Sequence, residues 1–474
     1  MKPAVLIDIV GLTEAQIGED TPNLSALRRR GACAPMTAVL PAVTCSAQAT
    51  MLTGSPPSEH GAVGNGWLDR KTWDIALWRQ SNHLIQGEKL YEAARRLHPD
   101  FTCAKLFWWW NMGAAVDWSI TPRPFYPADG RKIPATYSWP TEFGLEVERE
   151  LGAFPFFDFW GPRAGLPSSR WITDAALYTL RTHRPGLTLV YLPHLDYDHQ
   201  RYGPDDPRSR KALREVDGLL GELVAGADTQ GAETIVVSEY GIRPAERPVD
   251  INRALREAGL LVARETPTGE VLDPFGSRAF AVADHQVAHV YVNPVSSVRP
   301  GVARERNLQA ARETLEALPG VERVLGSEDK CEFGIDHANA GDLVAISDPD
   351  AWFTYYYWSD PSQTPDFART VDIHRKPGYD PCEMFLDPAL RAPKLRVARR
   401  VAAKKLGFRY LMDVIPIQPE LVRGSHGRLP DQPEHGPVFL STAGFGNTEP
   451  KNGCIEMTSV FHRTLAAMGL SETP

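Results

Sequence analysis

AVLID, at residues 4–8, is the first of three short apolar runs that each lead into an acidic residue. The second is LTLVYLPHLD at 187–196, and the third is TIVVSE at 234–239. Apolar runs of this length without polar alternation are typical of strands buried on both faces, as in a parallel sheet. The carboxyl ends of parallel strands meet at one edge of the sheet, where α/β proteins bind ligands. We therefore expect Asp8, Asp196 and Glu239 to lie close together.

Amphipathic segments separate these strands. Thr21 and Pro22 mark the start of a helix over 21–29, because Thr caps helices and Pro fits the first helical turn. Further helices are predicted over 45–52, 169–183, 208–225 and 307–318, and a further strand over 341–347. Short buried strands alternating with helices predict an α/β fold with a mostly parallel sheet sandwiched by helices.

Two regions interrupt this alternation. Residues 100–165 are rich in Trp and Pro, and residues 249–340 begin with a helical pattern and continue with strand-like sequence. We interpret 1–248 together with 341–474 as the core, which carries the Trp- and Pro-rich segment as an insertion over one edge. Residues 249–340 are then a smaller inserted cap.

The composition excludes several classes of protein. The 474 residues include 51 Lys and Arg against 59 Asp and Glu, a net charge of −8 that argues against broad nucleic-acid binding. No apolar stretch approaches the roughly 18 residues of a membrane helix, and the first residues do not resemble a secretory signal. Six scattered cysteines without a CxxC pair predict a reducing compartment, and hence the cytoplasm. The oligomeric state is not indicated.

A candidate nucleophile lies in PAVTCSAQATMLTG, residues 41–54. Thr44 comes directly before the predicted helix, where backbone amides and the positive helix end favour a bound phosphate and an alkoxide. Ser46 is the rival nucleophile, and a plain helix cap is the alternative role for Thr44. Three converging carboxylates repel one another unless they are protonated or neutralised, which indicates divalent cations as partners.

Together these motifs resemble the alkaline phosphatase superfamily, specifically its type I phosphodiesterase/nucleotide pyrophosphatase branch. The matching segments, in the family's order, are LIDIVGL (6–12), TPNLSALRRRGA (21–32), PAVTCSAQATMLTGSPPSEHGAVGN (41–65), LPHLDYDHQRYGP (192–204), VVSEYGI (236–242) and GSHGRLPDQPEHGPVFLS (424–441). The resemblance implies an α/β core with a cap inserted after the SEYG motif. It also implies a phosphoryl-transfer site that binds one or two divalent cations.

The resemblance assigns roles to particular residues. Asp8 is similar to the family's metal ligand on the first strand, and Thr44 to its nucleophile, which also binds metal. Asn65 is similar to the asparagine that contacts phosphate. Asp196 is similar to a ligand of the other metal, and His426 is similar to the family's late histidine ligand.

The chain departs from the family pattern at several positions. Gln200 stands where the Asp-x-x-x-His segment has its histidine ligand, and the Ser-Asp-His-Gly motif reads with Glu239 and Tyr240 in its middle positions. Ala47 replaces the asparagine usual three residues after the nucleophile. Glu239 can still bind a cation, but oxygen replaces nitrogen ligands. This change either moves the expected preference from zinc toward manganese, magnesium or calcium, or weakens one metal site outright.

A polar run at 372–380 offers a compensating set of residues. There His374 is a candidate for the missing metal ligand, and Arg375 or Lys376 for a contact with phosphate oxygens. The alternative is a solvated charged loop. We interpret His285 and His289, four residues apart, as packed or surface-paired residues rather than ligands.

The aromatic segment around residues 108–110 has two interpretations. It forms either a compact aromatic core, which aromatic burial favours, or a pocket wall over the site. In the second interpretation Arg123, Arg131 and Lys132 supply positive charge for an anionic substrate.

These features predict a metal-dependent hydrolase of phosphoric esters that acts on a phosphorylated small molecule. The preferred substrates are phosphodiesters or pyrophosphate bonds, cleaved through a phospho-threonine intermediate at Thr44. One alternative is a phosphatase or phosphotransferase that acts on a phosphorylated small metabolite. The other is a protein that binds phosphate compounds without cleaving them.

Overall fold

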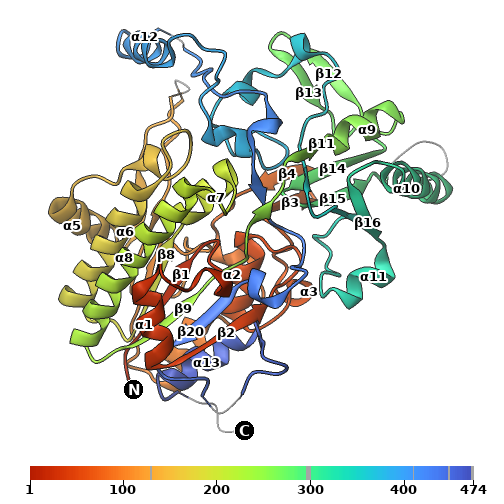
Figure 1. Cartoon of the computed structure of the whole chain (residues 1–474). Coiled ribbons are helices and arrows are strands. Elements are labelled where there is room, and N and C mark those ends of the chain that lie inside the picture. Colours follow the sequence, from red (N-terminus) through yellow and green to blue (C-terminus); the bar gives the residue numbers. More distant parts are fainter. Residues whose placement is uncertain (129–130, 295–299, 409, 447–448, 471–474) are drawn as a thin grey trace.

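In the computed structural model, which describes residues 1–128, 131–294, 300–408, 410–446 and 449–470, an α/β core is joined to a second sheet (Figure 1). The core sheet has the strand order β21-β2-β20-β9-β1-β8-β5-β6-β7. Its strands are β1 (Ala4–Ile9), β2 (Ala32–Thr37), β5 (Cys103–Leu106), β6 (Trp118–Pro122), β7 (Thr136–Trp139), β8 (Leu187–Leu192), β9 (Glu233–Val237), β20 (Val438–Ser441) and β21 (Ile455–Glu456). The strands from β9 to β6 are parallel, whereas β20 and β7 run antiparallel to their neighbours, so the predicted mostly parallel sheet is confirmed.

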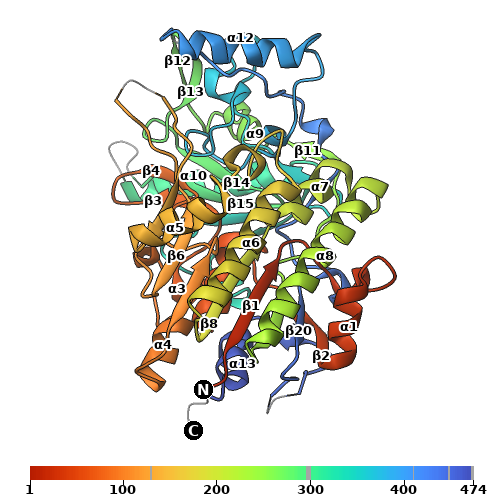
Figure 2. The same ribbon diagram turned by 90° about the vertical axis from the view of Figure 1, so that its left-hand side faces the viewer.

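Helices cover both faces of this sheet. Figure 2 shows α6 and α8 in front of β1 and β8, with α13 behind the sheet. The helices of the core are α1 (Pro22–Arg30), α2 (Thr44–Thr53), α3 (Pro57–His60), α4 (Leu90–Leu97), α5 (Thr141–Leu151), α6 (Leu166–Thr182), α7 (His194–Tyr202), α8 (Pro207–Thr229) and α13 (Ser459–Ala467). The start predicted for α1 is confirmed, with Thr21 as its N-cap and Pro22 in its first turn.

The three acid-bearing strands are neighbours at the centre of the sheet. All six residues of β1 are buried, as are all six of β8, which fits apolar runs covered on both faces. In the register of the sheet, Asp8 lies opposite Tyr191 of β8 and Val237 of β9. The parallel register therefore brings the carboxyl ends of β9, β1 and β8 to one edge.

The second sheet is antiparallel, with the order β14-β15-β17-β16. Its strands are β14 (Ala279–Asp284), β15 (Val287–Val292), β16 (Val321–Leu325) and β17 (Leu343–Ser347). Around it lie α9 (Ile251–Glu257), α10 (Pro300–Glu316), α11 (Ser327–Glu332) and α12 (Pro393–Lys405), and the strand pairs β3 (Gly66–Asp69) with β4 (Asp74–Leu77), β10 (Arg243–Pro244) with β19 (Gly424–Ser425), β11 (Arg247–Val249) with β18 (Ala351–Phe353), and β12 (Ala263–Thr266) with β13 (Gly269–Leu272). Because β17 pairs with β15 and β16, this sheet extends past the cap boundary predicted at residue 340.

The Trp- and Pro-rich segment also differs from the expectation of a simple insertion. It supplies β5, β6 and β7, which form one end of the core sheet. These strands are only four or five residues long, and the prolines and tryptophans around them conceal the apolar pattern of a buried strand. Short length and unusual composition therefore leave these three strands of the core sheet without a recognisable strand pattern in the sequence.

Two further findings concern the chain as a whole. All six cysteines are free thiols, and the cytoplasmic location stays a prediction. Within the described ranges, every helix is too short or too polar to cross a membrane.

Candidate functional site

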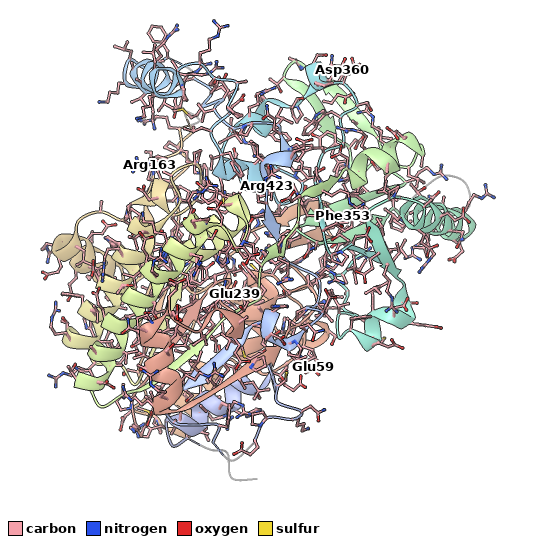
Figure 3. The ribbon with its side chains drawn as sticks, viewed as in Figure 1. Glu59, Arg163, Glu239, Phe353, Asp360 and Arg423 are labelled. Atoms are coloured by element: carbon pink, nitrogen blue, oxygen red, sulfur yellow. The ribbon has the colours of Figure 1, made fainter. Side chains whose placement is uncertain are left out.

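The three strand-end acids lie close together, as the sequence predicts. Asp8 belongs to β1, Glu239 follows β9, and Asp196 lies in the first turn of α7 after β8. Asp8 and Glu239 are fully buried, and Glu239 lies near the centre of the molecule (Figure 3). Hydrogen bonds through three neutral side chains connect the acids, namely Thr44, Gln48 and Tyr240.

Thr44 is the first residue of α2 and faces this acid cluster. Its Oγ1 donates a hydrogen bond to Glu239 Oε2 (2.7 Å) and lies 3.4 Å from the hydroxyl oxygen of Tyr240. Ser46, the rival nucleophile, instead donates to the backbone oxygens of Pro41 (2.6 Å) and Val43 (3.1 Å) and is fully buried. The geometry therefore favours Thr44, whose hydroxyl is paired with a carboxylate that can accept its proton.

Gln48, one helical turn after Thr44, bridges two of the acids. Its Nε2 donates to Glu239 Oε1 (2.6 Å) and to Asp8 Oδ2 (3.2 Å). Its Oε1 accepts a hydrogen bond from the backbone N–H of Trp109 (2.6 Å). Because that N–H can only donate, the amide oxygen must face Trp109 and the amide nitrogen must face the carboxylates.

Burial governs the charges of the Asp8–Glu239 pair. The pKa of Asp8 is raised well above its usual value by burial and by the neighbouring Glu239 carboxyl. Burial also raises the pKa of Glu239, but hydrogen bonds from Asp8, Thr44 and Gln48 oppose that rise. The pair is therefore best described with the proton on Asp8 and the negative charge on Glu239, the group that Thr44 contacts.

Asp196 forms the other end of the cluster. Its Oδ1 accepts from the Tyr240 hydroxyl (3.2 Å) and its Oδ2 from Gln200 Nε2 (2.8 Å), while Gln200 Oε1 accepts from the Tyr379 hydroxyl (2.9 Å). Burial raises the pKa of Asp196 to about 7. Burial and the nearby Asp196 and Glu239 raise the pKa of Tyr240 well above its usual value, so this phenol stays protonated.

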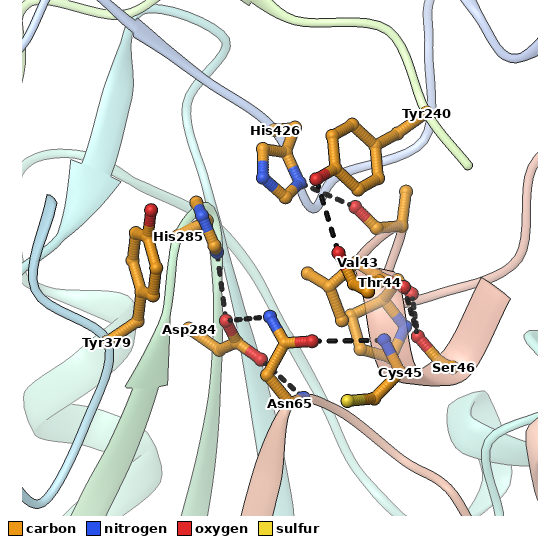
Figure 4. Close-up of polar contacts among 12 residues, drawn as sticks. Val43, Thr44, Cys45, Ser46, Asn65, Tyr240, Asp284, His285, Tyr379 and His426 are labelled. Carbon is orange, nitrogen blue, oxygen red and sulfur yellow. Dashed lines mark hydrogen bonds and ion pairs between the residues drawn. The ribbon is translucent and has the colours of Figure 1, made fainter. Parts of the chain in front are cut away.

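Four aromatic rings stack beside the acids in the order Tyr240, His426, His285 and Tyr379 (Figure 4). Successive ring centroids lie 3.5, 3.8 and 3.7 Å apart. His285 occupies the two-residue turn between β14 and β15 with a φ of 59°, a left-handed conformation rare for a non-glycine residue. His285 is packed between two rings, as one of the two predicted arrangements had it, and it also lines the pocket described below. His289 is packed, with Nε2 2.8 Å from Val63 O.

Asn65, the predicted phosphate contact, is occupied by protein groups. Its Oδ1 accepts from Cys45 N (3.0 Å), and its Nδ2 donates to Asp284 Oδ1 (3.0 Å). The same Asp284 oxygen lies 2.8 Å from His285 Nδ1 (Figure 4). Asn65 therefore connects the start of α2 to the turn that carries His285.

A pocket of about 1010 Å³, its open mouth included, leads to Thr44. Its inner end contains Thr44, Asp196, Gln200, Tyr240, His285 and Tyr379. Its walls are largely aromatic and include Trp78, Trp109, Phe156, Phe159 and Trp160, while Arg123 and Lys132 supply positive charge. Trp108 and Trp110 are fully buried in the core, so the 108–110 segment serves both predicted purposes, with Trp109 in the pocket.

The polar run at 372–380 contributes less to this pocket than predicted. His374 lines the pocket wall, with its Nδ1 3.3 Å from Leu77 O. The Arg375 side chain is exposed and pairs with Asp372 (3.2 Å). Lys376 is buried in ion pairs with Asp380 (2.7 Å) and Glu383 (2.6 Å) instead of lining the pocket. Its neighbour Tyr379, which the sequence did not single out, contacts Gln200.

The two ends of the acid cluster differ in how they fit the cations that the resemblance implies. Between Asp8 and Glu239, N–H groups of Gln48 point at both carboxylates and would repel a cation, so this end does not fit one. At the other end, His426 Nδ1 lies 2.8 Å from the carbonyl oxygen of Ala42 and must donate to it. The lone pair of His426 is therefore on Nε2, which lies 3.9 Å from Asp196 Oδ1.

His285 adds a second imidazole to the Asp196 end. Among the described residues its buried Nε2 has no hydrogen-bond partner. Two imidazoles and a carboxylate, each imidazole fixed through Nδ1 by an oxygen, are the donor chemistry of a metal site. In the part of the chain that the structure describes, however, no three His, Cys, Asp or Glu side chains are already arranged around one point. By donor chemistry, the Asp196 end fits one cation.

The fold and site define an α/β protein with an acid cluster beside a hydroxyl at a helix start. The chain belongs to the type I phosphodiesterase/nucleotide pyrophosphatase family, whose sequence pattern matches residues 4–380. This is a family of phosphodiesterase and nucleotide pyrophosphatase hydrolases, so the predicted family and enzyme class are confirmed.

Two curated relatives are each 26% identical to this chain. One is an uncharacterized pyrophosphatase/phosphodiesterase of Schizosaccharomyces pombe, matched over 229 residues, 47% of this chain and 41% of that protein. The other is human ectonucleotide pyrophosphatase/phosphodiesterase family member 7, matched over 244 residues, 48% of this chain and 45% of that protein. The matches thus span less than half the length of either relative.

Solved structures with the same fold include phosphonoacetate hydrolase from Sinorhizobium meliloti in complex with phosphonoacetate. It has a TM-score of 0.58 at 16% identity, with 98% of this chain and 96% of that chain covered. Another is an inactive variant of murine ectonucleotide pyrophosphatase/phosphodiesterase 5 in complex with AMP. Its TM-score is also 0.58 at 14% identity, with 100% and 96% of the two chains covered. At these identities the likeness shows the fold alone.

Proposed function

We propose that this protein hydrolyses phosphoric esters, preferentially diesters or pyrophosphate bonds, with Thr44 as its nucleophile. The observation that carries the proposal is the hydrogen bond of 2.7 Å from Thr44 Oγ1 to Glu239 Oε2 at the inner end of the pocket. A hydroxyl is a weak nucleophile until a neighbouring base takes its proton. Glu239, the ionised member of its acid pair, is positioned to be that base.

The proposed reaction begins with attack of Thr44 Oγ1 on phosphorus while Glu239 accepts the hydroxyl proton. The positive end of α2 stabilises negative charge that develops at this point. Tyr240, which stays protonated, places its hydroxyl oxygen 3.4 Å from the same oxygen and donates its single proton to Asp196. The alcohol or phosphate departs with the proton that Glu239 accepted and leaves a phospho-threonine, which still carries the second organic group of a diester. Water then hydrolyses this intermediate.

The residues at the Asp196 end bear on the cofactor. Asp196, His426 and His285 would hold one divalent cation, which when bound would neutralise charge on the phosphoryl oxygens. Gln48 supplies hydrogen-bond donors at the Asp8 end, where the resemblance implies another cation. The proposed enzyme therefore depends on one cation rather than two.

The lining of the pocket supports the proposed preference for diesters over monoesters. A diester carries one negative charge and a second organic group, whereas a monoester is close to a dianion near neutral pH. The residues at the inner end of the pocket are neutral donors and acids, and the cations that line the pocket, Arg123 and Lys132, lie among its aromatic walls. An apolar organic group suits those walls, because aromatic faces bury apolar surface.

Substitution of Thr44 tests this proposal directly. Thr44→Ala should abolish hydrolysis of bis(p-nitrophenyl) phosphate, whereas Ser46→Ala, the matched control in the same helix, should remain active. Full activity of the Thr44 variant would remove this residue from the reaction. Faster turnover of p-nitrophenyl phosphate than of the bis-ester would favour the phosphatase alternative.

The alternative of binding without cleavage is supported by Gln48, whose amide donates to Asp8 and Glu239. Hydrogen bonds of this kind are also expected where a site has lost its cation. Purified protein should therefore be assayed with added manganese, magnesium and zinc. Absence of turnover with all three, together with retained binding of the bis-ester, would replace the enzyme proposal by binding without cleavage.

A further inference from the structure

Helix α12 stands apart from the rest of the molecule. In both Figure 1 and Figure 2 it lies at the end farthest from the two termini. None of its residues is buried, which is unusual for a helix of 13 residues in a protein with an extensive core. Packing within this chain therefore does not account for the residues on the outer face of α12.

The inner face of α12 anchors the helix to the body of the protein. Val397 packs against an apolar cluster that includes Val371, which also lines the pocket. Arg396 and Arg400 both form ion pairs with Asp413. These contacts fix which side of the helix faces solvent.

The outer face presents an apolar stripe. Leu395, Ala398, Ala402 and Leu406 follow one another at spacings of three or four residues, so they share one side of the helix. Leu395 is 61% exposed and Leu406 is 73% exposed. Phe408, just beyond the helix, is 66% exposed. Large apolar side chains aligned in this way on a surface indicate an interaction site.

Positive charge surrounds this stripe. Residues 388–412 contain eight Lys or Arg residues and no acid, although the whole chain carries a net charge of −8. Two of the eight are neutralised by Asp413, while Lys394, Arg399 and Lys405 are exposed beside the stripe. We call the exposed residues Lys394, Leu395, Ala398, Arg399, Ala402, Lys405, Leu406 and Phe408 the α12 surface.

We propose that the α12 surface docks the protein on an anionic phospholipid bilayer. A basic amphipathic helix lies in the plane of such a bilayer with its apolar stripe among the acyl chains and its cations at the lipid headgroups. Long Lys and Arg side chains suit this position because their charged ends reach the headgroups while their stems remain apolar. A specific protein partner would instead require an interface of roughly 1,200 Å² or more, which one projecting helix does not readily supply.

One wall of the pocket lies toward the same end of the molecule. Both views show the described parts of the connection between β6 and β7 extending toward α12. On that connection Phe125 is 62% exposed and Tyr126 is 52% exposed, and Tyr126 also lines the pocket. Docking through α12 would therefore bring these two aromatic residues, and the pocket wall to which Tyr126 belongs, toward the bilayer.

Vesicle flotation with the full chain tests the proposal. The protein should bind phosphatidylcholine vesicles that contain phosphatidylserine, and should bind pure phosphatidylcholine vesicles much more weakly. The double variant Lys394→Glu/Lys405→Glu should bind at least about 30-fold more weakly, because loss of each cation beside an anionic leaflet weakens binding about five-fold and the two added carboxylates weaken it further. Leu395→Ser/Leu406→Ser should also weaken binding, without a change in charge.

A matched control is Arg29→Glu/Lys211→Glu, which makes the same change in net charge on exposed residues of α1 and α8. It should bind the anionic vesicles nearly as the unmodified protein does. Equal loss in both charge variants, or no binding of the unmodified protein, would overturn the proposal. Binding to soluble poly-glutamate but not to vesicles would instead identify an acidic protein partner. Unchanged hydrolysis of a soluble diester would show that the α12 variants remain folded.

Discussion

Glu239→Gln tests whether Glu239 takes the proton from Thr44. Besides its contact with the Asp8 carboxyl, the Glu239 carboxylate accepts hydrogen bonds from Thr44 Oγ1 (2.7 Å) and Gln48 Nε2 (2.6 Å). A glutamine at this position has only one oxygen, and its amide nitrogen must donate. In the favourable arrangement, the oxygen of the new glutamine accepts from Gln48 and its amide nitrogen faces Thr44. The Thr44 hydroxyl then has no base to accept its proton, although its position is unchanged.

The expected loss follows from the role of a general base. Proton transfer to a positioned side chain typically contributes about 10²- to 10⁴-fold to the rate. The variant should therefore lose kcat/KM for bis(p-nitrophenyl) phosphate by that factor, equivalent to about 3–5 kcal/mol of transition-state stabilisation. Its thermal unfolding should change little, because the substitution keeps the shape of the side chain.

Asp8→Asn is the matched control in the same pair of acids. Asp8 carries the proton of that pair, so an asparagine copies its neutral, donating state. The activity should fall by less than about 10-fold, the range of one neutral hydrogen bond. A loss in Asp8→Asn as large as in Glu239→Gln would refute this reasoning, because it would mean that Asp8 acts as an ionised cation ligand.

Three further predictions concern charged residues around the site and the core. Arg123→Ala should raise KM for an anionic diester about 3- to 10-fold in steady-state kinetics, because Arg123 lines the pocket. Arg375→Ala should leave KM unchanged. Equal effects of the two substitutions on KM would contradict the pocket described here. Lys376→Met leaves the buried Asp380 and Glu383 without their cation, so urea denaturation should show a free energy of unfolding lower by about 3–5 kcal/mol. An unchanged free energy of unfolding with a raised KM would instead place Lys376 in substrate binding. Burial lowers the pKa of His60 to about 3, so below pH 6.5 the unfolded chain binds a proton that the folded chain does not, and stability should fall as the pH drops toward 3. By pH 5 this amounts to about 2 kcal/mol, and His60→Asn should show a correspondingly smaller acid loss by denaturant titration; an identical acid loss would contradict this origin.

The sequence was informative where local pattern and topology agree. Apolar runs such as 4–8 and 187–192 indicate buried parallel strands, and parallel strands fix where Asp8 and Asp196 must lie. Thr44 was identifiable because its position before a helix and the surrounding motif both point to the same chemistry. These features need no knowledge of distant partners.

Other parts of the site depend on contacts that no local pattern reveals. Gln48 shares a helix with Thr44, but its role follows from the backbone N–H of Trp109, 61 residues away. His285 reaches the site because a two-residue turn of the second sheet packs against Tyr379 and His426. The spacing of His285 and His289 indicated only a shared face of a strand, since the turn between β14 and β15 was not apparent.

The polar run at 372–380 shows the same limit. Its composition indicated Lys376 as a phosphate contact. The Lys376 ammonium instead forms ion pairs with two buried acids, Asp380 and Glu383. Tyr379, three residues later, reaches Gln200 instead. Residue type alone did not distinguish a structural ion pair from a ligand contact.

The most direct test of the account is mass spectrometry of protein quenched with acid during turnover of bis(p-nitrophenyl) phosphate. We expect one phosphoryl group, with its p-nitrophenyl ester, on the peptide that contains Thr44, located on the threonine by fragmentation, and none in Thr44→Ala. A phosphoryl group on another residue would contradict the account. So would steady turnover without any phosphorylated protein in rapidly quenched samples from the first turnover onward.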